Sequence, residues 1–198
     1  MHDDLVAAVD ADLQHAIATL EDLVRIPSVS APGYDRHRLA ESAAAAAELI
    51  SNSGASNVRL LELEGAHPAV YGEVPGPEGA PTVLLYAHHD VQPPGPDAEW
   101  ETPPFAPMRR NGRLHGRGTA DDKSGIAMHA AVVRAFAGAP PVTLKLFFEG
   151  EEEVGSTNLA AFLDRFSEEL AADVIVIADS GTLETGVPAL TTSLRGLV

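Results

Sequence analysis

Histidine and carboxylate side chains gather where apolar stretches of the chain end. His88 and Asp90 follow the apolar run Val83–Tyr86, which is typical of a buried strand. Side chains alternate along a strand, so His88 and Asp90 are expected to point to one side and His89 to the other. An imidazole combined with carboxylates is a ligand set that zinc and similar ions take in proteins. This segment therefore predicts part of a metal-dependent hydrolase site.

Further acidic residues follow the same pattern later in the chain. The pair Asp121-Asp122 precedes a helical stretch, and both the acidic run Glu149–Glu153 and the single residue Asp179 close apolar runs. Carboxylates at the ends of several strands, with one histidine among them, favour a metal-hydrolase site.

Strands and helices alternate along the chain as in an α/β domain. Helices are expected over 5–24, 39–51, 122–136 and 156–166, and strands over 58–63, 69–73, 83–86, 142–149, 174–178 and 189–194. This order predicts a three-layer α/β/α catalytic domain with a mostly parallel mixed sheet, covered on both faces. Ligands bind such sheets at the carboxyl ends of the strands, where this chain places its acidic residues and His88.

The segment Gln92–Asn111 differs from the rest because it contains seven prolines and glycines that disfavour regular structure: Pro93, Pro94, Gly95, Pro96, Pro103, Pro104 and Pro107. We interpret it as a rigid loop beside the predicted site.

Composition narrows the class of protein. The 198 residues suffice for one sizeable core, and a hydrophobic content of 45% is that of a globular chain. No cysteine is present, so a metal would be held by oxygen and imidazole nitrogen alone. A formal net charge of −16 argues against nucleic acid or an anionic membrane as the partner. The acidic start Met1–Asp4 is unlike a signal peptide, and a cytoplasmic location is expected.

Several motifs in a fixed order resemble those of one known family, the cocatalytic zinc metallopeptidases. This family includes carnosinase-type dipeptidases, acetylornithine deacetylase, succinyl-diaminopimelate desuccinylase and glutamate carboxypeptidase. The resemblance runs from the first helix to the C-terminus, and its motifs are His88–Pro93, Trp100, Pro104–Pro107, Gly112–Gly118, Asp121–Gly125, Glu149–Ser156 and Asp179.

The resemblance implies a role for each matching residue. His88 and Asp179 would hold one of two divalent ions, Glu153 would hold the other, and Asp121 would bridge them. The ions would be zinc, with cobalt or manganese as alternatives. Glu152 would act as the general base, and Asp90 would accept a hydrogen bond from His88 and so fix its tautomer. The Asp121–Asp122 peptide bond is expected to be cis.

Neighbouring residues of the same types receive a structural interpretation. His89 faces away from His88, and His115 and His129 are expected to pack within the fold. Glu149 and Glu151 flank the adjacent pair Glu152 and Glu153, but the family's Glu-Glu-x-Gly-Ser ending favours the latter pair for chemistry. Trp100 is expected to anchor its loop.

The resemblance also predicts that this chain is the N-terminal part of a catalytic domain. The family places its last histidine ligand near the C-terminus, whereas all eight histidines here precede Asp179. A lid domain, through which the full-length protein would form a homodimer, is expected after the region of Thr191–Gly196, and the 198 residues alone are expected to be nearly inactive.

Three functions remain open at this stage. Asp122 after Asp121, together with Val91-Gln92-Pro93, favours a dipeptidase acting on small peptides. The alternatives are an N-acyl amino acid deacylase with the same metals, and an inactive metal-binding fragment or pseudoenzyme.

Overall fold

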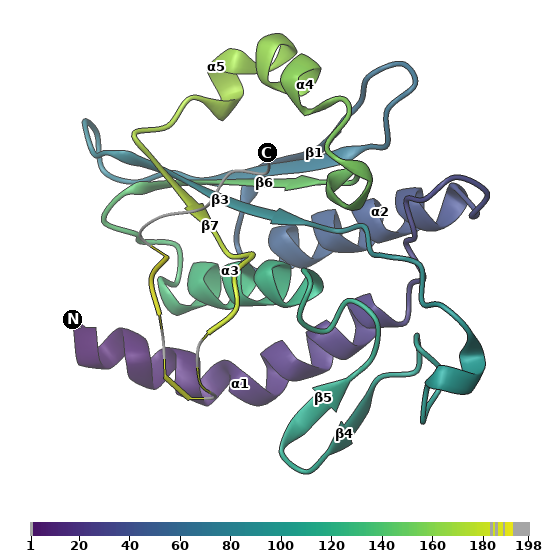
Figure 1. Ribbon diagram of the computed structural model, residues 1–198. Helices are drawn as coiled ribbons and strands as arrows, with labels where there is room; N and C mark the ends of the chain where they lie inside the picture. Colours follow the sequence, from purple (N-terminus) through teal and green to yellow (C-terminus); the bar gives the residue numbers. More distant parts are fainter. Residues whose placement is uncertain (1, 183, 185, 188, 192–198) are drawn as a thin grey trace.

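A five-stranded mixed sheet forms the centre of the molecule (Figure 1). The computed structural model describes residues 2–182, 184, 186–187 and 189–191. The strands of the sheet lie in the order β1-β2-β6-β3-β7. Their bounds are β1 Ser56–Leu61, β2 Ala69–Val74, β6 Thr143–Glu149, β3 Thr82–His88 and β7 Val174–Ile177. The β6–β3 and β3–β7 pairings are parallel, whereas β1–β2 and β2–β6 are antiparallel.

Helices cover both faces of this sheet, which confirms the predicted three-layer architecture. On one face lie α1 (His2–Val24), α2 (His37–Asn52) and α3 (Lys123–Ala135), and on the other lie α4 (Leu159–Arg165) and α5 (Ser167–Leu170) (Figure 1). None of the described helices is both long and apolar enough to cross a membrane.

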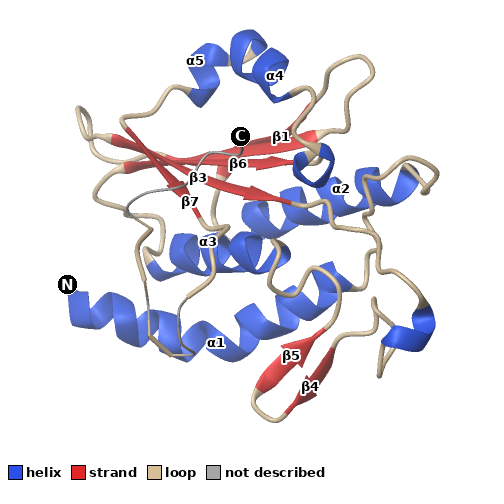
Figure 2. Cartoon of the chain, viewed as in Figure 1, coloured by secondary structure: helices blue, strands red, loops and turns tan. Residues whose placement is uncertain are grey.

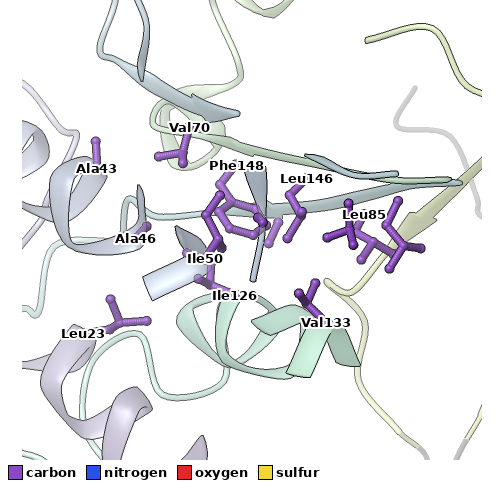
Figure 3. Packing of buried hydrophobic residues seen from close by; sticks show 14 residues of the cluster. Leu23, Ala43, Ala46, Ile50, Val70, Leu85, Ile126, Val133, Leu146 and Phe148 are labelled. Atoms are coloured by element: carbon purple, nitrogen blue, oxygen red, sulfur yellow. The ribbon is translucent and has the colours of Figure 1, made fainter. Parts of the chain in front are cut away.

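The alternation of side chains along the strands produces two hydrophobic cores. On β3, Leu85 and Ala87 pack into the larger core with α2 and α3, whereas Leu84 belongs to the smaller core with Phe162 of α4. Figure 3 shows the larger core, in which Phe148 and Leu146 of the sheet lie among helix residues such as Ile50 and Ile126. Because side chains alternate along β3, successive residues at its end project toward opposite faces of the sheet.

The expected helices and central strands are present with ends shifted by a few residues. The helix expected from Ser156 begins at Leu159 instead, after a short 3-10 turn at Glu152–Val154 (η2). The strand expected over 189–194 extends into residues 192–194, which lie outside the described residues.

The prediction that Gln92–Asn111 lacks regular structure was wrong in two short places. A 3-10 turn, η1, spans Asp97–Glu99, and a hairpin joins β4 (Met108–Arg110) to β5 (Arg113–His115) (Figure 2). The hairpin turns at Asn111 and Gly112, whose φ angles are 52° and 73°. Asn-Gly is the sequence that best adopts two consecutive positive φ angles, so this turn overrides the disfavouring effect of the nearby prolines.

Candidate metal centre

The candidate site lies at the carboxyl ends of the parallel strands. His88 is the last residue of β3 and pairs in register with Glu149, the last residue of β6. Asp179 follows β7 by two residues. Glu152 and Glu153 lie in η2 just after β6, and Asp121 lies in the loop before α3. The structure therefore brings all of the predicted site residues to one edge of the sheet.

His88 occupies the centre of the cluster and is fully buried. Its Nδ1 lies 3.0 Å from the backbone oxygen of Asp90 and 3.3 Å from that residue's Oδ1. Its Nε2 faces the opposite way, 3.0 Å from Asp121 Oδ1 and 3.8 Å from both Glu152 Oε2 and Asp179 Oδ2. Asp90 thus holds one ring nitrogen while the other is presented to three carboxylates.

Asp90 also connects the end of β3 to the two adjacent glutamates. Its carboxylate is buried and accepts the backbone N–H of Glu152 at 3.2 Å and that of Glu153 at 3.1 Å. One side chain therefore contacts both the imidazole and the turn that carries Glu152 and Glu153.

Two groups of potential ligand atoms form around His88. One contains His88, Asp121 and Glu153, and the other contains His88, Glu152 and Asp179, with the atoms of each group within 4.8 Å of one another. The two groups share His88, whereas the ligand sets implied by the family resemblance share Asp121. Imidazole nitrogen with several carboxylate oxygens suits zinc, cobalt or manganese, so the donor set fits the implied ions.

The electrostatics of the cluster reflect crowded negative charge. Burial raises the pKa of both Glu152 and Glu153, and the charges of Asp179 and Asp121 respectively add to that rise. Burial would lower the pKa of His88, but the hydrogen bond and charge of Asp90 outweigh it, and the pKa rises to about 10. Divalent cations would offset this repulsion among the carboxylates.

The bond between Asp121 and Asp122 is a cis peptide, as the resemblance implied. Asp122 itself belongs to neither ligand group. Its buried carboxylate accepts the backbone N–H of Gly125 at 3.2 Å, which caps α3, and that of His88 at 3.3 Å. Burial raises the pKa of Asp122 to about 7.

The acidic residues flanking the Glu152–Glu153 pair are engaged in the surrounding fold. Glu149 accepts hydrogen bonds from the Tyr86 and Ser156 hydroxyls. Glu151 accepts the backbone N–H of His67 at 2.8 Å and both the backbone and side-chain amides of Asn158.

Residues interpreted as structural also have partners within the fold. His89 is fully buried, its Nε2 lies 2.8 Å from the Pro68 carbonyl oxygen, and burial lowers its pKa to about 4. His129 Nε2 lies 3.0 Å from the carbonyl oxygen of Tyr86. Trp100 donates its indole N–H to the Pro94 carbonyl at 2.7 Å, within its own loop.

Two residues near the site were missed by sequence reasoning. Lys123 is fully buried, and its Nζ donates to the carbonyl oxygens of Leu23 at 2.8 Å, in the last turn of α1, and of Ile26 at 2.6 Å, just after that helix. Gln92 donates both its backbone N–H and its side-chain amide to Glu153. The only signal was their place inside the motifs, since neither residue type indicates such a contact by itself.

Sequence comparisons relate this chain to known peptidases. Residues 84–192 match the peptidase family M20/M25/M40. The chain is 42% identical over 120 residues to a cysteinylglycine-S-conjugate dipeptidase of Corynebacterium striatum, covering 59% of this chain and 26% of that protein. It is 32% identical over 205 residues to the Beta-Ala-His dipeptidase of Mus musculus, covering 95% and 42% respectively.

A solved structure shows the same fold. The dipeptidase Dug1p of Saccharomyces cerevisiae superposes with a TM-score of 0.84 at 27% identity, over 95% of this chain and 43% of that one. The chain thus spans less than half the length of each of these three proteins. The match to more than half of its residues and the shared fold show that this chain belongs to the peptidase family M20/M25/M40.

Proposed function

We propose that this chain is the N-terminal part of the catalytic domain of a metal-dependent dipeptidase. The observation that carries the proposal is the surrounding of His88 Nε2 by Asp121, Glu152 and Asp179 at 3.0 to 3.8 Å. The names of the relatives, which are dipeptidases, support a small peptide as the substrate.

Two divalent ions complete the proposed site. His88 and Asp179 would hold one, Glu153 the other, and Asp121 would contact both. Zinc is the proposed metal, with cobalt and manganese as alternatives that accept the same oxygen and nitrogen donors. When bound, the ions would polarise the amide carbonyl and lower the pKa of a water molecule.

The protein's own contribution is to place a proton carrier beside these ions. Glu152 would take a proton from the attacking water and deliver it to the departing amine. Burial raises its pKa, which makes the protonated form more accessible near neutral pH. Asp90 would hold His88 Nδ1, so that Nε2 stays available as a ligand.

A dipeptide panel on the full-length protein tests this function. We expect higher kcat/KM for unblocked dipeptides, such as Cys-Gly or β-Ala-His, than for N-acetyl amino acids. The same preparations, analysed for bound metal, should contain two ions per chain. A preference for acetylornithine or succinylated amines would favour the deacylase alternative, and a metal-bound protein without turnover would favour the inactive one.

We also propose two wider properties of the full-length protein. The resemblance to the family supports a homodimer formed through a lid domain. The molar mass measured by light scattering tests this: twice the mass of one chain supports the dimer, and the mass of a single chain contradicts it. The absence of cysteine supports a cytoplasmic location, because disulfides are rare there. The formal net charge of −16 argues against nucleic acid and anionic membranes as partners.

A further inference from the structure

Gln92 contacts both oxygens of one glutamate in the candidate site. Its backbone N–H donates to Glu153 Oε1 at 3.2 Å, and its side-chain Nε2 donates to Glu153 Oε2. A carboxylate has about four acceptor positions, so these two bonds leave further lone pairs for other partners. Glu153 is therefore oriented by a single residue from a different segment of the chain.

The backbone on either side of Gln92 restricts where this amide can lie. Val91, which is fully buried, donates its N–H to the Ser28 carbonyl at 2.9 Å and bridges to Val29. Pro93 follows, and its ring limits the backbone directly after Gln92. Gln92 is thus presented from a fixed position at the start of the proline-rich loop.

The adjacent glutamate is held differently. Within the part of the chain that the structure describes, no donor hydrogen-bonds the Glu152 carboxylate, and its contact with the His88 ring is at 3.8 Å. The backbone amides of both glutamates are bound alike by Asp90, so the difference lies in the side chains. The Glu153 carboxylate thus accepts two hydrogen bonds from Gln92, whereas the Glu152 carboxylate accepts none from the described residues.

We propose that Gln92 is a positioning residue that orients Glu153 for metal binding and leaves Glu152 free to carry protons. This inference rests on the proposed function. A ligand held in its binding orientation loses less side-chain freedom when an ion binds, whereas a general base must reorient between water and leaving group. The division of roles between two adjacent, chemically identical residues thus comes from a third residue outside their turn.

Zinc titration of the full-length protein by calorimetry, with Gln92→Met, tests the inference without relying on turnover. Methionine keeps the length of the side chain and removes the amide donor, while the backbone N–H remains. We expect about a 10-fold loss of affinity at one of two sites, the low end for ligand-supporting groups, because Gln92 is exposed to water.

Gln14 on α1 provides a matched control, because it is also exposed and lies in the first helix. Gln14→Met should leave both zinc affinities unchanged. Equal affinities in Gln92→Met and Gln14→Met would overturn the role of Gln92. A wild-type protein that binds no zinc would instead overturn the proposed metal centre, and the inference with it.

A double-mutant cycle separates action through Glu153 from a general structural effect. If Gln92 acts through Glu153, Gln92→Met should change zinc affinity in the wild type and leave it unaltered in a Glu153→Gln background. The same loss of zinc affinity in both backgrounds would contradict the proposal. An equal fall in affinity at both zinc sites of Gln92→Met would contradict it as well.

Discussion

The carboxylate of Asp90 accepts the backbone N–H of Glu152 at 3.2 Å, which joins the end of β3 to the turn after β6. The two residues are 62 positions apart in sequence. Because the same carboxylate lies 3.3 Å from His88 Nδ1, a shift of this side chain would move the imidazole and the glutamate turn together. Asp90 therefore couples the two halves of the candidate site.

Replacing Asp90 with asparagine should weaken both halves at once. Asparagine keeps the size of the side chain, but it replaces one of the two acceptor oxygens by an NH2 group. That group would face a backbone N–H whose hydrogen bond Asp90 accepts, and two donors cannot bond to each other. We expect a 10–100-fold loss of metal affinity, as for other groups that support ligands, and a lower Tm. Zinc titration and thermal unfolding measure the two effects. Asp97→Asn, in the exposed turn η1, is the control and should change neither.

The adjacent glutamates should respond differently to the same substitution. In the full-length protein, Glu152→Gln should lower kcat by at least about 10²–10⁴-fold with metal content retained, because it removes a general base. Glu153→Gln should instead lower metal occupancy at one site. Elemental analysis and steady-state kinetics on both variants decide the assignment, which would be reversed if Glu152→Gln lost metal and kept its turnover.

Periodicity was enough to predict the parts of the site that depend on a single strand. Alternation along β3 placed His88 and Asp90 together and His89 opposite, and the buried His89 indeed lies against the Pro68 carbonyl. The contact between Asp90 and the amides of Glu152 and Glu153 could not be predicted in this way, because it depends on how β3 and β6 are aligned in the sheet. The antiparallel pairing of β1 and β2 was likewise not encoded in the apolar pattern of either strand.

Loop contacts were the least predictable feature. The reach of Gln92 toward Glu153 depends on the bridge between Val91 and Val29, which no local pattern indicates. The hairpin turn at Asn111 and Gly112 did carry a signal, but the prolines around it outweighed that signal in the sequence interpretation.

Buried His129 should make the fold sensitive to acid. Burial lowers the pKa of His129 below its usual 6.5, so the folded protein keeps the ring neutral where the unfolded chain would bind a proton. Its contribution to stability is complete above pH 6.5 and is lost as pH falls toward the folded pKa, by up to about 1.4 kcal/mol per pH unit. Denaturant unfolding of His129→Gln between pH 7 and 5 should therefore show a shallower loss than the wild type.

Glutamine suits this comparison because its amide can still donate to the Tyr86 carbonyl, although the ring stacking on Phe148 is removed. His37→Gln, at an exposed position on α2, is the control and should follow the wild-type pH profile. Identical profiles for His129→Gln and the wild type would mean that protonation of His129 is not linked to unfolding.

The edge strand β7 should promote association of the 198-residue chain. Its side chains Val174, Ile175, Val176 and Ile177 are 52%, 59%, 43% and 60% exposed, and β7 pairs only with β3 among the described strands. An exposed apolar strand with free backbone donors and acceptors is a template for pairing with another chain. We therefore expect concentration-dependent oligomers in size-exclusion chromatography with light scattering. We expect Ile175→Lys to reduce them, because a charge on an edge strand opposes pairing.

Leu163→Lys, on α4 and 46% exposed, adds the same charge elsewhere and should leave association unchanged. If both variants dissociate the oligomers equally, net charge rather than β7 controls association. A wild-type chain that is monomeric at all concentrations would contradict the prediction that β7 pairs with another chain.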